Sequence, residues 1–448
     1  MGELRILTSP LSGKNLIDDV KKKLEKPEVD ANVVLLYTSK DSRKYAGSLM
    51  EVLREKFPDA QMTGCSVEGY LTKDSVWTKG VAILLIDSDK VKIAHSAGRS
   101  TEKVFSRLNR EIKAKKKIAM FPLVYVPNLP NVMKLFAYDK VYYNLKYKRA
   151  KTLEEKKEVL REFSKILESK TIYPANVALN NLDGEVAGMN LMPLTGGYRS
   201  PTLYLNFKEC HRCCVCLGIE EKVRMYYHDV FPERGNSFEE TLEILKEYFG
   251  RLEVVDTVSE DIAIGEVNGK TAVRFLKERT RMSEFTENDI KQRKLSKESL
   301  PMVSPYALGY VSRVTAGCSM IGLQPYPINI YPSIFNLNNF YDSCVFTGEV
   351  FRGGISDFYG LFDKPVEEDS FKFFALDYNT IPMFTKKVHL LKERAKEKLR
   401  NFLGVIVSNP SIKKERLSRK YLTEIEKGLC FNGTGTSFMV EVPDIQVL

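Results

Sequence analysis

The sequence predicts an α/β protein in which mixed sheets are flanked by helices. Short, continuously apolar runs alternate along the chain with longer amphipathic segments, and turn-forming residues separate them. The composition, with 43% hydrophobic and 28% charged residues, is ordinary for globular proteins and excludes disorder for the chain as a whole. Because 448 residues exceed what one hydrophobic core usually organises, we expect two domains or one long duplicated one. We place the two units at residues 1–232 and 233–448.

The first hundred residues alternate between strand and helix patterns. Residues 33–37 are continuously apolar and predict a strand buried on both faces. Apolar residues then recur at helical spacing from Ala46 to Leu53, which predicts an amphipathic helix. The small residues of 61–66 suit a passage from a strand into a loop at a sheet edge. Residues 81–98 predict two strands joined by a turn that contains an aspartate.

The rest of the chain continues this mixed pattern. Residues 99–112 predict a helix with an apolar stripe on one face and basic residues on another. The helix predicted at 152–170 buries six apolar residues, which are Leu153, Val159, Leu160, Phe163, Ile166 and Leu167. Further elements are expected as buried strands at 118–128 and 403–408, and as helices at 237–250 and 386–403.

The net charge of +10 is concentrated in two segments. Residues 386–427 hold 13 Lys/Arg against 5 Asp/Glu, and residues 99–117 hold 8 against 2. Concentrated positive charge favours an anionic partner such as RNA, a nucleotide or a membrane surface. The competing interpretation is a pair of solvated helix faces that keep the protein soluble, since charge runs usually report solubility.

The sequence predicts a soluble cytoplasmic protein with reduced thiols. Its N-terminal segment lacks the apolar run of a signal peptide, and no window approaches the roughly 18 apolar residues that span a bilayer. Eight cysteines are sparse for this length, so a disulfide framework is not expected.

A cluster of cysteines invites a metal interpretation. It consists of Cys210, His211, Cys213, Cys214 and Cys216. A structural zinc site needs four ligands, usually as two pairs, and the sequence holds no second pair. If the segment is a strand, Cys214 and Cys216 share one face and act as small buried hydrophobes, which is the reading we favour over a metal site or a redox pair.

Catalytic motifs are absent. The four histidines form no recognised catalytic arrangement, and the sequence contains no nucleophile elbow, phosphate-binding loop or zinc-protease motif. Cys65 follows a predicted strand, but no partner histidine can be assigned to it. We therefore expect neither catalytic residues nor a metal site, and we expect that the protein is not an enzyme.

Three segments carry a resemblance to a known family. The order of an apolar strand, a helix, Pro-Asp-Ala at 58–60, the residues GCSVEGYL at 64–71 and a VAILLI strand is similar to the N-terminal half of FIST domains. Residues 254–276 resemble a later segment of the same family, with an Asn268-Gly269 turn. Residues 300–318 are similar in position to the start of the C-terminal FIST half, where Arg313 stands for its strand arginine.

This resemblance implies two intimately associated FIST-like halves and a non-enzymatic sensory module for a small, amino-acid-like ligand. Some family members bind haem, although no histidine in this sequence is singled out as its axial ligand. A pocket in such a sheet needs backbone donors and a few polar side chains at strand ends. We expect them from Gly64, Cys65, Ser66 and Gly69, together with Arg313; the alternative for this loop is a tight turn packed between sheet and helix.

The preferred hypothesis is therefore a stand-alone sensor that signals through an unidentified partner protein, with its oligomeric state, including a homo-oligomer, left open. The rival hypothesis is an RNA- or ribosome-binding factor, because fold alone does not decide function. Its phosphate contacts would come from basic residues of both charged segments, namely Arg107, Arg110, Lys115, Lys116, Lys117, Lys413, Lys414, Arg416, Arg419 and Lys420.

Overall fold

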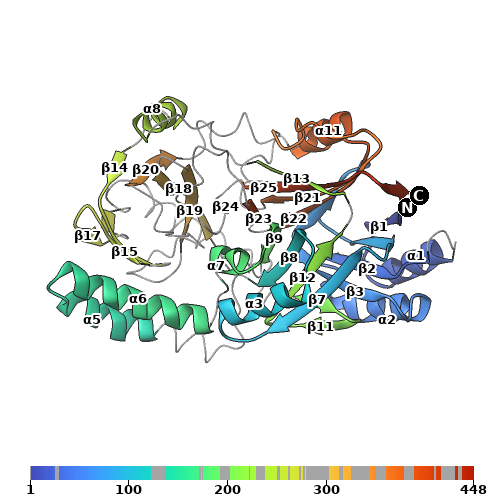
Figure 1. Ribbon diagram of the computed structural model, residues 1–448, viewed down its shortest axis with the longest axis horizontal. Coiled ribbons are helices and arrows are strands. Elements are labelled where there is room, and N and C mark those ends of the chain that lie inside the picture. The colour runs from blue at the N-terminus through green and yellow to red at the C-terminus, as the bar shows by residue number, and fades with distance from the viewer. Residues whose placement is uncertain are drawn as a thin grey trace.

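The structure is a computed structural model of the chain (Figure 1). It describes residues 2–25, 30–122, 137–170, 173, 175–191, 202–220, 222–228, 238–249, 253–260, 263–271, 274–275, 278, 302–311, 316–323, 343–349, 360–377, 388–407, 410–414, 429–431 and 436–448.

Three large sheets form the body of the protein. Sheet A has seven strands in the order β11-β10-β3-β2-β6-β1-β26. Within it, β2 and β3 run parallel and are joined by helix α2, whereas β6 runs antiparallel to β2. Its strands are β1 (Gly2–Ser9), β2 (Val33–Ser39), β3 (Gln61–Val67), β6 (Val81–Asp87), β10 (Leu203–Leu205), β11 (Lys208–Cys210) and β26 (Ile445–Val447).

Sheets B and C have six strands each and contain the same kind of parallel pair. Sheet B follows the order β13-β25-β21-β22-β4-β5, with β13 (Arg224–His228), β25 (Ser437–Val442), β21 (Phe371–Asp377), β22 (Asn401–Val407), β4 (Gly69–Leu71) and β5 (Val76–Trp77). Sheet C follows the order β24-β23-β9-β8-β12-β7, with β24 (Leu429–Phe431), β23 (Pro410–Lys414), β9 (Glu185–Leu191), β8 (Lys116–Pro122), β12 (Cys213–Ile219) and β7 (Val91–Ala97).

Two smaller sheets lie on the other side of the molecule, at the left of Figure 1. One contains β14 (Glu253–Val255), β20 (Ser343–Glu349), β18 (Met302–Val311) and β19 (Ala316–Leu323). The other contains β15 (Thr257–Glu260), β16 (Ala263–Val267) and β17 (Lys270–Thr271). The two-residue turn Asn268-Gly269 joins β16 to β17, with both residues at positive φ, as its Asn-Gly sequence predicts.

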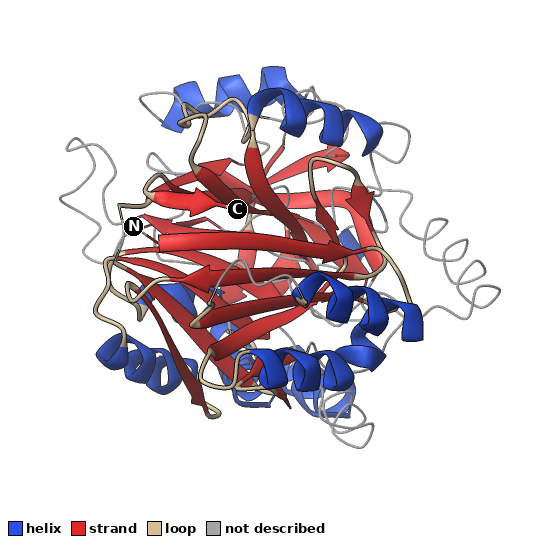
Figure 2. Cartoon of the chain, turned by 90° about the vertical axis from the view of Figure 1, so that its right-hand side faces the viewer, coloured by secondary structure: helices blue, strands red, loops and turns tan. Residues whose placement is uncertain are grey.

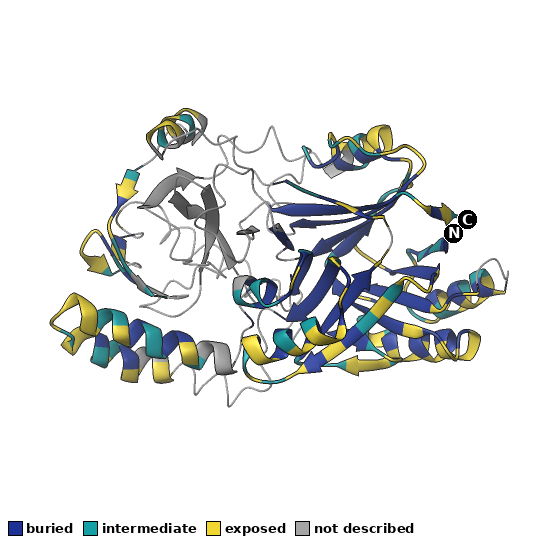
Figure 3. Cartoon of the chain, viewed as in Figure 1, coloured by how far each residue is buried: buried dark blue, intermediate teal, exposed yellow. Residues whose placement is uncertain are grey.

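Helices cover the outer faces of the large sheets, so that strands fill the interior and helices lie around it (Figure 2). The described helices are α1 (Lys14–Leu24), η1 (Arg43–Tyr45), α2 (Ala46–Lys56), α3 (Thr101–Glu111), the π-helical turn η2 (Tyr138–Tyr143), α5 (Asn144–Arg149), α6 (Leu153–Lys170), α7 (Ala175–Asn180), α8 (Phe238–Phe249) and α11 (Val388–Lys398). Helices α1 and α2 pack on sheet A, α3 and α7 on sheet C, and α11 on sheet B. Burial follows this arrangement: the central strands of the large sheets are buried, the edge strands β7 and β11 are partly exposed, and the helices expose one face (Figure 3).

The inner faces of the three sheets enclose one shared apolar core. Tyr37 of sheet A stacks on Phe373 of sheet B with ring centroids 5.7 Å apart, and Val215 of sheet C belongs to the same cluster. Each sheet therefore buries both faces, one against the other sheets and one against helices. This explains why so many strands are continuous apolar runs rather than alternating ones.

Most predicted elements are confirmed. Strands form at 33–39 and 81–87, and α2 and α3 bury the predicted apolar stripes. Helix α6 buries Val159, Leu160 and Phe163 as predicted. The prediction that Leu153 is buried is wrong, since its side chain is 56% exposed at the first position of the helix.

The large sheets interleave distant parts of the chain. Strand β26 pairs with β1, β23 pairs with β9, and β25 pairs with β13. Sheets A, B and C thus each contain strands from both sides of residue 232, so the two expected halves share their sheets. The boundary between residues 1–232 and 233–448 stays a prediction.

Gly64 is required by the close approach of β3 to β2. Its φ is +144°, and a Cβ built on it would lie 1.9 Å from the main-chain oxygen of Leu36. We expect Gly64→Ala to lower the free energy of unfolding by about 3 kcal/mol, because the clash is with backbone. The matched control is Gly47→Ala in α2, where a Cβ meets nothing within 4 Å. There we expect a gain of about 0.5–1 kcal/mol, and denaturant unfolding of both variants measures the difference. Equal stability of the two variants would contradict the packing described here.

Candidate functional site

Strands β3, β22 and β9 each belong to a parallel pair, in sheets A, B and C respectively. Their carboxyl ends meet where the chain passes between sheets. The main-chain nitrogen of Glu68, just after β3, donates to Ile406 O of β22 at 2.9 Å. Beyond β22, Pro410 of β23 lies opposite Met189 of β9. The ends of β3, β22 and β9 are therefore adjacent, and we call this region the carboxyl-end edge (Figure 1). In open α/β sheets, ligands characteristically bind outside the carboxyl ends of strands.

Four hydroxyl-bearing residues gather on the helix-facing side of sheet A at this edge; we call Thr38, Ser66, Thr202 and Tyr204 the hydroxyl cluster. All four are buried. The hydroxyls of Thr38 and Tyr204 share a hydrogen bond of 2.5 Å. The main-chain nitrogen of Thr202 donates to Ser66 Oγ at 3.3 Å, and Ser66 N donates to Thr202 O at 2.9 Å. The cluster thus links the carboxyl ends of β2 and β3 to the start of β10.

The start of the crossover helix closes this side of the edge. Ser42 Oγ accepts from Gly80 N at 2.9 Å and from Ser39 Oγ at 3.3 Å, which fixes the turn before η1. Arg43 follows it; its side chain is half-buried and forms no ion pair with a described residue. Its positive charge acts to lower the pKa of Tyr204, although desolvation is the larger effect and raises that pKa overall. A cation and the start of a helix therefore lie beside the hydroxyl cluster.

The prediction of a loop at residues 64–66 is wrong. These residues lie in β3, paired with β2 on one side and with β10 on the other. Their main-chain groups belong to these two ladders, so the backbone donors expected for a ligand are used within the sheet. Gly69 lies in β4 opposite Ile406, where a Cβ would approach the Trp77 carbonyl oxygen to 2.6 Å.

Of the predicted ligand residues, the structure therefore brings Gly64, Cys65 and Ser66 together on one strand, with Gly69 three residues further on. Only Ser66 presents a polar group toward the hydroxyl cluster. Arg313 lies outside the described residues. A ligand role for this set stays a prediction.

Two buried polar side chains at the carboxyl-end edge have no hydrogen-bond partner in the described part of the chain. They are the hydroxyl of Thr202 and the side-chain amide of Asn190, near the end of β9. Both residues are fully buried. Buried polar groups are nearly always hydrogen-bonded, because leaving one unpaired costs about 1–3 kcal/mol. Sequence reasoning missed both residues, since neither belongs to a motif; the low-charge, Asn- and Gly-rich composition around them was the only signal.

Cys65 faces the shared core rather than the hydroxyl cluster. Complete burial raises the pKa of its thiol far above the usual value. The thiolate, which is the nucleophilic form, is therefore strongly disfavoured at neutral pH.

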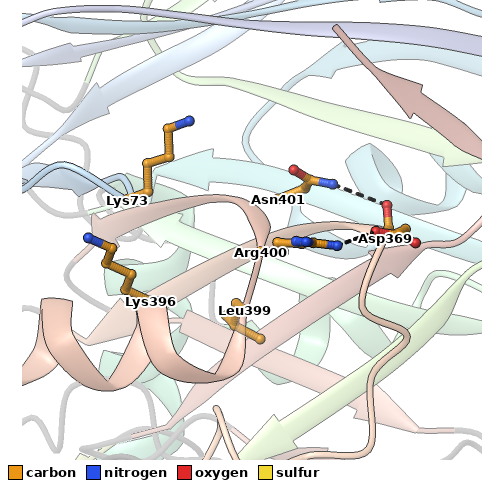
Figure 4. A pocket seen from close by; sticks show the side chains of 6 residues that line it. All are labelled: Lys73, Asp369, Lys396, Leu399, Arg400 and Asn401. Atoms are coloured by element: carbon orange, nitrogen blue, oxygen red, sulfur yellow. Dashed lines mark hydrogen bonds and ion pairs between the residues drawn. The ribbon is translucent and has the colours of Figure 1, made fainter.

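A second candidate is an open pocket of about 520 Å³ at the amino end of β22, at the opposite end of sheet B (Figure 4). Lys73, Lys396 and Arg400 line it together with Asp369. Arg400 is already paired with the Asp369 carboxylate at 3.0 Å, and Asn401 donates to Asp369 O at 3.2 Å. Lys396 lies in the last turn of α11, and Arg400 lies two residues beyond its end. Cations are favoured at a helix C-terminus, so the helix accounts for both residues without a ligand.

Among the described residues, the basic side chains of the rival hypothesis do not all lie on the surface. Arg107, Arg110 and Lys115 are exposed, whereas Lys116 forms an ion pair with Glu185. Lys117 and Lys413 are buried, with exposed fractions of 1% and 4%. In β23 the backbone of Lys414 is described but its side chain is not, and Arg416, Arg419 and Lys420 lie outside the described residues.

Lys117 and Lys413 act inside sheet C. Both lie opposite Val186 of β9, one on each side, so they form a row across three strands. Their ammonium groups donate to consecutive main-chain oxygens, of Asp183 and Leu182 respectively, in the turn after α7. These two lysines therefore hold a turn in place and are not available to phosphates.

The cysteine cluster follows the strand interpretation. Cys214 and Cys216 lie in β12 and are buried in the core under α3 and α7, as predicted. Cys213 is buried on the opposite face, and Cys210 is half-buried at the end of β11. Within the described residues, no group of three or more His, Cys, Asp or Glu side chains is arranged to hold a metal ion.

The histidines that the structure describes do not fit haem. His95 and His211 are exposed, and His228 is buried on β13 with its own interactions. An axial ligand needs an apolar pocket beside it, and none of these three side chains lies in one. The side chain of His389 lies outside the described residues. Haem binding stays an implication of the family resemblance alone.

Comparison with known proteins agrees with this architecture. Residues 32–147, which include β2, α2, β3 and the hydroxyl cluster residues Thr38 and Ser66, match the FIST N domain. This part of the chain is thus similar to the FIST N domain, as the sequence resemblance implied. Residues 239–352 match a second family model, the AF0772-like protein C-terminal domain. The FIST family suggests a sensory or signal-transduction role.

One relative aligns over most of this chain and nearly all of its own length. An uncharacterized protein of Archaeoglobus fulgidus is 29% identical to this chain over 372 residues, which are 82% of this chain and 97% of that protein.

In the described part of the chain, no helix combines the length and apolarity that a bilayer crossing requires.

The burial of Lys117 can be tested against its exposed neighbour Lys115. We expect Lys117→Ala to lower the free energy of unfolding by about 2 kcal/mol, because it removes a packed side chain and leaves the Asp183 carbonyl without its donor. Lys115→Ala should change it by less than about 0.5 kcal/mol. Chemical denaturation measures both values, and a Lys117→Ala variant as stable as Lys115→Ala would show that the ammonium group lies in solvent.

Proposed function

We propose that this protein is an intracellular sensor that binds a small polar molecule at the carboxyl-end edge of sheet A and transmits its occupancy to a partner protein, without catalytic turnover. The single observation that carries the proposal is the buried, unpartnered hydroxyl of Thr202 within the hydroxyl cluster. Thr38 and Ser66 lie in the region that matches the FIST N domain, and that family suggests a sensory role.

The chemistry of the edge favours an amino-acid-like or small carboxylate ligand. Hydroxyl groups both donate and accept hydrogen bonds, so the cluster suits a ligand that carries both kinds of group. Arg43 adds a cation at the start of the helix segment, where a carboxylate is favoured. A few polar groups at the end of largely apolar strands are typical of small-molecule sites.

The absence of turnover is part of the proposal. The cysteine nearest the cluster, Cys65, has a pKa raised by burial and faces away from the cluster. Serine and threonine hydroxyls need an adjacent base to act as nucleophiles, whereas Ser66 hydrogen-bonds Thr202 and Thr38 hydrogen-bonds Tyr204. This arrangement supports binding rather than catalysis.

Thermal unfolding in the presence of single amino acids and small carboxylates tests the proposal. A ligand at 100 times its Kd should stabilise the protein by about 2.7 kcal/mol through mass action. Thr202→Val should abolish that shift, because it removes the hydroxyl while keeping the shape of the side chain. The free variant should be as stable as the parent or slightly more so, since the removed group is unpaired.

Thr101→Val is the matched control. Thr101 is equally buried and its hydroxyl is also unpartnered within the described residues, but it lies at the start of α3 beside sheet C. It should leave the ligand shift unchanged. The proposal fails if no compound of these classes stabilises the protein, or if both variants lose the shift equally. RNA that copurifies and whose affinity falls by roughly 0.7–0.9 log units per phosphate contact for each tenfold rise in salt would favour the rival hypothesis instead.

A further inference from the structure

The passage from sheet A to sheet C is made by a Cys-X-X-Cys segment. Strand β11 ends at Cys210 and β12 begins at Cys213, so only His211 and Arg212 separate the two sheets at this point. The first cysteine lies opposite Leu203 of β10, and the second lies opposite Ala97 of β7. Such a spacing in a tight connection brings two thiols within reach of each other.

The backbone holds the two cysteines in this arrangement. Arg212 has a positive φ of 49°, which is uncommon for a residue with a side chain. Its side chain hydrogen-bonds the hydroxyl of Tyr173, which itself donates to Gly98 O after β7. The turn is therefore tied to sheet C on the side away from β11. The Cys213 side chain lies close enough to Cys210 to affect its pKa. The thiols of Cys210 and Cys213 donate to the main-chain oxygens of His211 and Cys214 respectively, each at 3.8 Å.

The two thiols differ in exposure in the way that a thiol–disulfide exchange site requires. Cys210 is half-buried between the exposed residues Glu209 and His211, so a small molecule can reach its sulfur. Cys213 is 1% exposed, within the shared core. The other cysteines whose side chains the structure describes, Cys65, Cys214 and Cys216, are fully buried. Among the cysteines with described side chains, Cys210 is thus the most accessible.

We propose that Cys210 and Cys213 form a redox-active dithiol, in which Cys210 is the attacking thiol and Cys213 the resolving thiol, and whose substrates are low-molecular-weight disulfides. This proposal does not rest on the sensory function proposed above, since the dithiol can be present whether or not the hydroxyl cluster binds a ligand.

The exchange balances in two steps. The Cys210 thiolate attacks one sulfur of the disulfide, whose S–S bond breaks, and one small thiolate leaves. The Cys213 thiolate then attacks Cys210 Sγ in the mixed disulfide, forms the Cys210–Cys213 bond and releases the second small thiolate. The protein loses two electrons and two protons, and the disulfide is reduced to two thiols.

Electrostatics support these roles. The interaction with the Cys213 side chain lowers the pKa of Cys210, and this effect outweighs the opposing effect of burial. The same interaction and burial raise the pKa of Cys213. Cys210 therefore ionises first, and Cys213 keeps its proton until a mixed disulfide forms beside it. The buried thiols of the same strand are not activated, since desolvation raises the pKa of Cys216 to about 12.

Exchange with oxidised glutathione, followed by peptide mass spectrometry, tests the proposal. The parent protein should yield one internal Cys210–Cys213 disulfide, which reduced glutathione reverses. Cys213→Ala should stop at a stable glutathione adduct on Cys210, and Cys210→Ser should yield neither product. Cys216→Ala, a buried cysteine of the same strand, should react as the parent does.

Alkylation gives a readout that does not depend on a disulfide forming. Iodoacetamide should label Cys210 first, with a pH midpoint below that of an ordinary thiol, and Cys213→Ala should shift that midpoint upward. A shift of one pH unit corresponds to about a tenfold slower reaction at pH values below both midpoints. The proposal is overturned if the parent keeps a glutathione adduct without forming the internal disulfide, if Cys210 is labelled no faster than buried cysteines, or if the purified protein holds zinc that depends on both cysteines.

Discussion

The structure depends on one apolar core that three sheets share. Each sheet contributes an inner face, so residues such as Tyr37, Phe373 and Val215 contact partners from different sheets. Because helices cover the outer faces, the central strands of these sheets are buried on both sides. Around this core the chain passes directly from one sheet into another at three points, from β3 to β4, from β11 to β12 and from β22 to β23.

This constraint decides where chemistry can be placed. Polar side chains within doubly buried strands must find partners inside the protein, as Lys117 and Lys413 do at the carbonyls after α7. Groups that are free to meet a ligand or a reactant are left at the strand ends, where the chain changes sheet. The unpartnered hydroxyl of Thr202 and the accessible sulfur of Cys210 both lie there.

The elements that were predicted correctly are those whose pattern lies within a single segment of the sequence. Examples are the apolar run at 33–37, which forms a strand, and the apolar stripe of α3. The loop expected at 64–66 failed because glycine, cysteine and serine are small enough for a turn. What makes them a strand is β10, which pairs with them from some 140 positions further along the sequence. The row of Lys117, Val186 and Lys413 is likewise assembled from three distant strands. Counting charges along the sequence therefore assigned these two buried lysines to the surface by mistake.

Strand β10 connects the two proposed sites. Thr202 immediately precedes it, and Leu203, its first residue, lies opposite Cys65 on one side and Cys210 on the other. The strand is only three residues long, and its equally short neighbour β11 is the edge strand of sheet A. Short edge strands have few ladder hydrogen bonds and open at lower free energy than central strands. A covalent link between Cys210 and Cys213 would tie this edge to sheet C, so the redox state of the dithiol would act on the strand that positions Thr202.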